Sequence, residues 1–272
     1  MNINKTLFNG CVPFLNEYNC DEDLLYDFFF NTSSRLSKQD RAIKLIKKVM
    51  KPHGKEPLLD HLFELTKIEY GIQKSQSWVR DHFVHALYTF VLGIFINEKL
   101  IKNNSDCKVK HFSWKIASLF HDIGYPAEIA NNMLQAFADK TNSIKKKSLK
   151  DRPVHNTYVN LKVFPTGFDD LSNNNNAFDL IQKRLNSWKL NIKARQLFSN
   201  MLNSANICHG IISSLTVLYI TDLIYHEDND LDRSYLTNDI IDACSAIFIH
   251  ALENKQFNKS LIDCKTPAKK SN

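Results

Sequence analysis

The sequence predicts an all-α protein, and three observations point to that class. Only seven glycines and seven prolines occur in 272 residues, which is few for an all-β or a doubly wound α/β chain. Hydrophobic residues make up 43% of the chain, enough to bury a sizeable core. Many of them recur at helical spacing, in segments too long to be strands. We therefore expect long helices arranged in one large or two small domains.

The first part of the chain is expected to start irregularly and then to form helices. Residues 1–20 show no clear period, so we expect irregular structure there. Helices are expected next over three segments with apolar or aromatic faces: 21–30, 37–50 and 57–70. Residues 1–75 together would form an N-terminal helical extension. The longest expected helix, 77–100, is apolar on nearly every side, which predicts a central position.

The second part is expected to contain shorter helices and, from its composition, one loop insertion. A helix over 112–122 should end at Gly124 and Pro126, and a helix over 127–140 should follow. Residues 141–176 contain a lysine run, two prolines and four consecutive asparagines, which is typical of an inserted loop. Helices are expected again at 177–188, 194–202, 207–225 and 237–253. The expected domains are thus 1–75, 76–255 and a polar tail at 256–272.

Charge and cysteine content bear on environment and partners. The net charge is +6, and lysine-rich clusters lie at 44–51, 145–150 and 265–270. Such runs are typical of solvated faces; attraction of a nucleotide or nucleic acid is the alternative, although no nucleic-acid motif accompanies them. Six cysteines without CxxC spacing, and no signal peptide, predict reduced thiols in a cytoplasmic protein. The long apolar stretches carry His, Asp or Lys, so no membrane span is expected.

Histidines inside apolar segments are the main functional signal. They occur in RDHFVHALYTFVLG, SLFHDIGYP, CHGIISSLTVLY and AIFIHAL, which contain His82, His85, His121, His209 and His250. Each histidine alone would be interpreted as a hydrogen-bonded core or capping residue. Several of them on different helices of one bundle predict a shared metal site, because neutral imidazole is a common ligand of divalent ions.

The adjacent pair His121-Asp122 sharpens this prediction. Neighbouring residues on a helix point about 100° apart, so both reach one ion only near a helix end or across a two-metal centre. The following Ile-Gly-Tyr-Pro supplies such an end. A buried carboxylate without a partner is costly, and a cation is its natural compensation. We therefore expect a metal ion beside Asp122.

The order H…HD…H…H resembles the HD-domain superfamily of metal-dependent phosphohydrolases, over residues 76–255. This resemblance implies an HD-domain helical bundle that hydrolyses phosphomonoester, phosphodiester or nucleoside-triphosphate bonds. It matches His85 to the first family histidine and His121 and Asp122 to the HD pair. It matches His209 and His250 to the additional histidines of members with two metals. His82 has no fixed family role and is a candidate outer-shell base, ligand or core residue.

Two positions depart from the family pattern. The superfamily usually has a final aspartate ligand after the last histidine; the candidates here are Asp242, which precedes it, and Asp263 in the polar tail. A truncated chain, an aspartate from elsewhere and an incomplete site are the open alternatives. Tyr125 stands where many phosphodiesterase members carry a lysine. The basic residues that could contact phosphate, or be plain surface charges, are Arg80, Lys115 and Arg152.

The expected function is hydrolysis of a phosphoester in a nucleotide or another phosphorylated small molecule. One or two divalent ions (Mn, Fe, Zn, Ni or Mg) would be bound by the histidines and Asp122, and a metal-bound water would attack phosphorus. Asp122 and His82 are the expected catalytic residues, with His82 as a proton relay. Three alternatives stay open: a metal or nucleotide sensor without turnover, a di-iron oxygenase on the same scaffold, and a purely structural helical protein.

Overall fold

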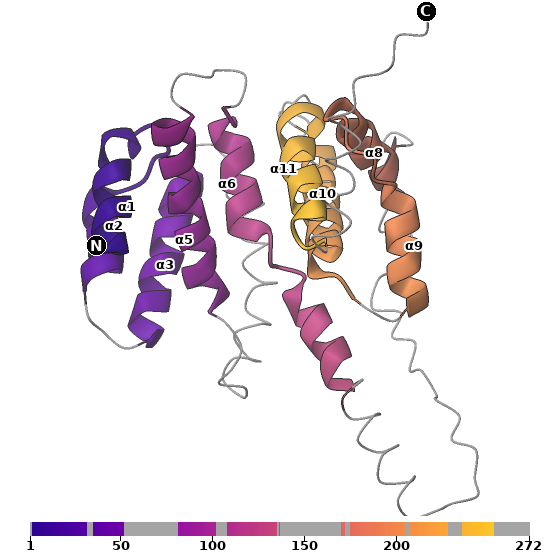
Figure 1. The fold of residues 1–272 in the computed structure, drawn as a ribbon, viewed down its shortest axis with the longest axis horizontal. Helices are drawn as coiled ribbons and strands as arrows, with labels where there is room; N and C mark the ends of the chain where they lie inside the picture. The colour runs from indigo at the N-terminus through magenta and orange to yellow at the C-terminus, as the bar shows by residue number, and fades with distance from the viewer. Residues whose placement is uncertain are drawn as a thin grey trace, which may run out of the picture.

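The computed structural model describes residues 2–31, 35–51, 81–101, 108–134, 136, 170–171, 175–204, 207–227 and 236–252. These residues are predominantly helical, which confirms the all-α class (Figure 1). Within them, strand structure is limited to an antiparallel pair, β1 (Asp170–Leu171) with β2 (Asn175–Asn176). The expected helix at 57–70, most of the 141–176 insertion and the tail lie outside the described residues. No described helix has both the length and the hydropathy to cross a membrane.

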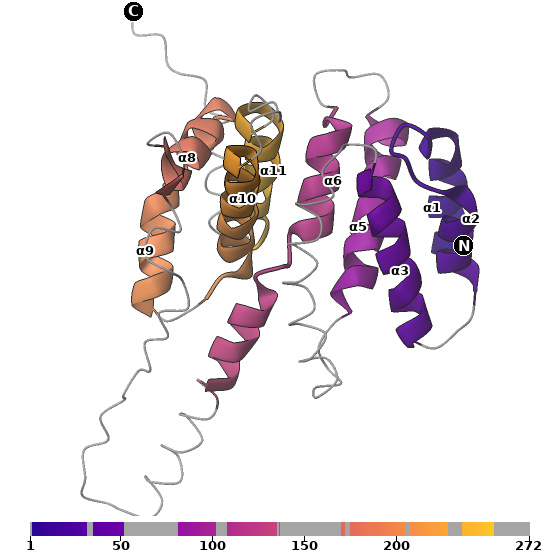
Figure 2. The same cartoon turned by 180° about the vertical axis from the view of Figure 1, so that it is seen from behind.

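The helices lie side by side in a row, as both views show (Figures 1 and 2). One end of the row is formed by α1 (Ile3–Cys11), α2 (Glu22–Phe30) and α3 (Arg35–Met50), which neighbour α5 (His82–Phe95). The other end is formed by α8 (Ala177–Ser187) and α9 (Ala194–Ser204). Between the two ends lie α6 (His111–Phe120), α10 (His209–Glu227) and α11 (Ile241–His250).

The short helix α6 lies at the centre of this row. It packs against α5 on one side and against α11 on the other, and α11 in turn packs against α10. Its buried side chains include four apolar ones and three polar ones: Phe112, Ile116, Leu119 and Phe120, and Ser113, Lys115 and Ser118. The chain then turns at residues 121–124 and enters another helix over 125–134. The end of α6 therefore sits where the two halves of the molecule meet.

The expectation that residues 1–20 are irregular is wrong, because α1 occupies most of the first half of that segment. The Asn2 side chain caps α1 by accepting hydrogen bonds from two backbone N–H groups of its first turn. Gly10 and the asparagines weaken the helical signal in the sequence. Tertiary packing overrides that weakness, since one face of α1 is buried against α2 and α5 through Leu7, Phe8 and Cys11.

The expected boundaries of the later helices are close to those observed. The segment 77–100 contains α5 and a π-helical turn, Ile96–Leu100, while residues 77–80 lie outside the described part. The segment 237–253 contains a π-helical turn, Leu236–Ile240, followed by α11. Both π-helical turns adjoin an α-helix that carries a site histidine, and both lie at the end of that helix opposite the histidine.

Candidate metal centre

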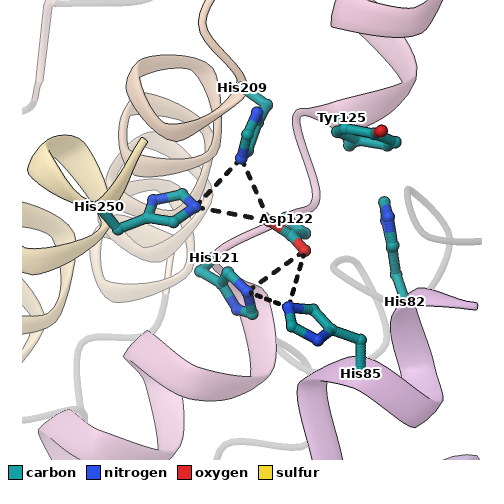
Figure 3. A pocket seen from close by; sticks show the side chains of 7 residues that line it. All are labelled: His82, His85, His121, Asp122, Tyr125, His209 and His250. Atoms are coloured by element: carbon teal, nitrogen blue, oxygen red, sulfur yellow. Dashed lines mark hydrogen bonds and ion pairs between the residues drawn. The ribbon is translucent and has the colours of Figure 1, made fainter. Parts of the chain in front are cut away.

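Four helix ends converge on one pocket (Figure 3). Helix α5 contributes His82 and His85 from its first turn, and His121 and Asp122 follow directly on α6. Helix α10 begins at His209, and α11 ends at His250. The pocket has a volume of about 170 Å³, and its lining combines all six predicted site residues with Tyr125. Residues far apart in the sequence are thus brought together as expected, although metal binding by them stays a prediction.

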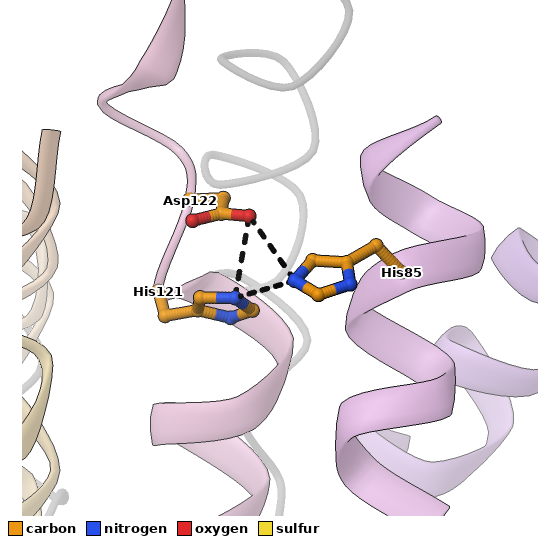
Figure 4. A group of neighbouring side chains, drawn as sticks. All are labelled: His85, His121 and Asp122. Carbon is orange, nitrogen blue, oxygen red and sulfur yellow. Dashed lines mark hydrogen bonds and ion pairs between the residues drawn. The ribbon is translucent and has the colours of Figure 1, made fainter. Parts of the chain in front are cut away.

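The first group of donor atoms consists of His85, His121 and Asp122, hereafter the His85 group (Figure 4). The Nε2 atoms of the two histidines are 3.3 Å apart. The Oδ2 atom of Asp122 lies 3.2 Å from His121 Nε2 and 3.6 Å from His85 Nε2. Three donors therefore face a common point.

The second group consists of Asp122, His209 and His250, hereafter the His209 group. The two Nε2 atoms are 3.1 Å apart. The other carboxylate oxygen of Asp122, Oδ1, lies 3.3 Å from His209 Nε2 and 3.5 Å from His250 Nε2. Asp122 thus offers one oxygen to each group, which is the arrangement needed for a carboxylate that bridges two ions.

These separations match the spacing of ligands around a metal ion. Donors bound at about 2.1 Å, with angles between tetrahedral and octahedral values, lie roughly 3.0 to 3.4 Å from each other. The separations in both groups, 3.1 to 3.6 Å, lie in or just above that interval. Each group could therefore hold an ion after very small side-chain movements.

Hydrogen bonds from Nδ1 to the backbone determine which ring nitrogen of His121 and His250 faces the pocket. His121 Nδ1 donates to the carbonyl oxygen of Ser118 at 3.0 Å, and His250 Nδ1 donates to that of Ile247 at 2.7 Å. A carbonyl oxygen only accepts, so each Nδ1 carries a proton and Nε2 is the nitrogen that faces the pocket. The short separations between Nε2 atoms therefore require a proton or a metal ion between the two nitrogens of each pair.

Two glycines in the motifs allow the helix ends to approach. A Cβ atom on Gly124 would lie 2.7 Å from the His209 carbonyl oxygen, and one on Gly210 would lie 2.9 Å from both His250 Nδ1 and the Ile247 carbonyl oxygen. A side chain at either position would force the backbones apart. Gly124 and Gly210 therefore allow the close packing of the helix ends that form the pocket.

Glu128 is a site residue that the sequence analysis missed. It lies in the helix over 125–134, and its Oε2 atom accepts hydrogen bonds from both the backbone N–H and Nδ1 of His209, at 3.0 and 2.5 Å. Burial raises the pKa of Glu128, but the contacts with His209 outweigh it and the pKa is lowered. The only sequence signal was an acid in the first turn of a helix, which normally indicates a favourable interaction with the helix dipole.

The electrostatics of the pocket favour positive charge. Burial raises the pKa of Asp122, yet hydrogen bonding with His121, His209 and His250 has the larger effect and holds the pKa far below its usual range. Burial lowers the pKa of His209, whereas the carboxylates of Asp122 and Glu128 raise it, with a net rise to about 9. The cluster therefore stabilises a charged carboxylate and attracts a proton or another cation.

His82 lies in the pocket but belongs to neither donor group. Its ring makes a T-shaped contact with the Tyr125 ring, with centroids 4.4 Å apart, and Tyr125 makes a T-shaped contact with the His209 ring, with centroids 5.3 Å apart. Figure 3 shows His82 and Tyr125 together on one side of the two groups. This position fits an outer residue better than a ligand.

Other candidate residues lie elsewhere. Asp242 forms an ion pair with Arg184 at 2.8 Å and does not line the pocket. Lys115 is not a phosphate contact or a surface charge: it is 1% exposed, and its Nζ donates to the Val49 carbonyl oxygen at 3.3 Å. Burial lowers the pKa of Lys115 to about 8. The remaining candidates lie outside the described residues: Arg80, Arg152 and Asp263.

A third group of possible metal donors, two glutamates and a histidine, has a structural explanation. It contains Glu17, Glu98 and His111 at the opposite end of α6. Glu98 is buried and accepts hydrogen bonds from Tyr18, Asn97 and Lys108. Because the Lys108 ammonium already neutralises this carboxylate at 2.7 Å, the cluster has no need of a metal ion.

No protein-family model matches the chain, and it has no match among curated proteins or solved structures. The inference of function therefore depends on the pocket itself. Its distinguishing feature is the pair of three-donor groups that share Asp122.

Proposed function

We propose that the protein is a metal-dependent phosphohydrolase of the HD-domain superfamily, with two divalent ions bridged by Asp122. The observation that carries this proposal is the donor geometry: two groups of three donors, each at ligand spacing, meet on opposite oxygens of one carboxylate.

The donor chemistry narrows the choice of metal. Four imidazoles and one carboxylate make a nitrogen-rich set. Imidazole suits Fe, Zn and Ni, whereas Mg prefers oxygen ligands and water. We therefore favour a transition metal, with Mg the least suited of the five candidate metals.

The charge of the pocket supports an anionic substrate. Asp122 is the one carboxylate among the described lining residues, so two divalent ions would retain a large positive charge. Phosphoester oxygens would compensate that charge. When bound, the ions would supply Lewis acidity, which lowers the pKa of water and neutralises charge on phosphoryl oxygens.

The protein side chains have separate roles in this proposal. The His85 and His209 groups would each hold one ion, and Asp122 would offer one carboxylate oxygen to each of them. His82 stands outside both groups, where its ring could transfer a proton to or from the reacting oxygen. Its contact with Tyr125 restricts the orientation of the ring.

The test combines metal analysis with a substrate panel. Purified protein should contain a transition metal and, with Mn, Fe, Ni or Co added, hydrolyse a phosphomonoester, phosphodiester or nucleoside triphosphate. His121→Ala should lower metal content from two ions to one and turnover by at least about 100-fold, because it removes a ligand of the His85 group. His111→Ala, a histidine on the same helix but outside the pocket, is the matched control. Wild-type protein that neither binds metal nor turns over any substrate would refute the proposal.

One observation favours a second candidate, a metal or nucleotide sensor without turnover. Asp242 is paired with Arg184 and supplies no further carboxylate to the described pocket. Each ion would then have three protein ligands and would depend on water or substrate for the rest. Tight nucleotide binding without product formation would identify this function.

A further inference from the structure

We infer that Glu128 is a positioning residue that sets how tightly the His209 group holds its ion. This inference rests on the proposed metal centre. Glu128 comes from the helix over 125–134, whereas His209 begins α10, and the two residues are 81 positions apart in the sequence. One carboxylate oxygen of Glu128 accepts from two groups of His209, so it restrains both the backbone and the ring of that residue.

The place of His209 at a helix start explains why it needs this partner. His121 and His250 stand at helix C-terminal ends, where each ring donates Nδ1–H to the carbonyl oxygen three residues earlier. Such carbonyls lack partners within the helix, so they are available to the ring. The first residue of a helix has no preceding helical turn to supply one, and its own N–H also needs an acceptor. Glu128 satisfies both needs of His209.

The contact also affects the ligand atom itself. In the neutral ring, donation of Nδ1–H to a carboxylate fixes the tautomer in which the Nε2 lone pair faces Asp122 and His250. A charged acceptor makes the ring a stronger donor to a metal than a backbone carbonyl does. Removal of such a partner commonly weakens metal binding by about 10- to 100-fold. The effect should be confined to the ion of the His209 group, since the hydrogen bonds and the ion pair of Glu128 are made to His209.

The experiment titrates the 272-residue chain with Co²⁺ alone, using equilibrium dialysis and the visible spectrum of the bound ion. Wild type should bind two Co²⁺ ions. Glu128→Ala should retain one with wild-type affinity and bind the other about 10- to 100-fold more weakly. Glu128→Gln keeps the size and an acceptor oxygen, so the second affinity should be intermediate. It also serves as the second variant should the alanine variant fail to fold. Glu17→Gln, an exposed acid outside the pocket, should leave both ions unchanged.

The outcomes distinguish the inference from the proposed function. Two ions bound by both Glu128 variants with wild-type affinity would overturn the role of Glu128 and leave the metal centre intact. Equal weakening of both ions would mean that Glu128 only supports the fold, which also overturns the inference. A wild-type chain that binds no Co²⁺ would overturn the proposed function itself.

Discussion

The roles of the histidines depend on which ring nitrogen faces the pocket. His121 and His250 use the same local device, a bond from Nδ1 to the carbonyl three residues earlier, and His209 uses Glu128 instead. The sequence could identify the histidines because each interrupts an apolar run. It could not identify Glu128, because the partner of that acid is 81 residues away and becomes evident only when α10 is placed in space.

Lys115 leads to a prediction about stability and pH. Its pKa is about 8 in the folded chain, below the unfolded value, so the unfolded chain binds more protons between about pH 8 and 10 and stability rises with pH in that window. Lys115→Met should therefore stabilise the protein at pH 7 by about 1 to 3 kcal/mol, less the lost bond to Val49. The difference in unfolding free energy between Lys115→Met and wild type should disappear near pH 10. Urea unfolding of both chains at the two pH values measures it.

A less stable Lys115→Met variant at pH 7 would contradict this explanation and would show that the ammonium makes a net favourable contribution. Cysteine ionisation in the unfolded state also changes stability in this pH range, because burial raises the pKa of Cys11 and Cys20 to about 12. The Cys11 contribution is common to both chains and cancels in the difference between the variant and wild type. The Cys20 contribution cancels only in part, because the Lys115 charge lowers the pKa of Cys20.

At the level of helices, the pocket depends on close approach of α10 and α11. Gly210→Ala would place a Cβ against backbone and the His250 ring, so we expect a loss of about 1 to 3 kcal/mol in the free energy of unfolding and weaker metal binding. Gly10→Ala is the matched control: its Cβ would meet the Phe95 side chain, at the end of α5 opposite to the histidines of that helix. It should lower stability without changing metal content.

Thermal unfolding and metal analysis of the two glycine variants separate these effects. Metal content that falls equally in both would contradict the link between Gly210 and the pocket. A Gly210→Ala chain with wild-type metal content would also contradict that link.

The helices were largely predictable, and the exceptions have physical causes. Helical spacing of apolar residues indicated α2, α3, α6 and α8 to within a few residues. It did not indicate α1, whose asparagines and glycine have low helix propensity and whose stability comes from packing against α2 and α5. The burial of Lys115 was also unexpected, since a lysine in an amphipathic segment normally marks the solvent face.

For the whole molecule, the row of helices explains the position of the site. The groups on α5 and α6 lie on one side of Asp122, and those on α10 and α11 lie on the other (Figures 1 and 3). The carboxylate therefore stands where the two halves meet, and metal binding would link them. The sequence could assign residues to the site but not divide them between the two oxygens of Asp122, because that division depends on how the helices pack.

The most direct test of the central claim is the number of metal ions bound per chain in single-ligand variants. Elemental analysis after equilibrium with Co²⁺ should give two ions for wild type, one for His85→Ala, one for His209→Ala and none for Asp122→Ala. This pattern follows from two groups that share only Asp122. Loss of both ions in His85→Ala, or two ions retained in Asp122→Ala, would contradict a centre bridged by that carboxylate.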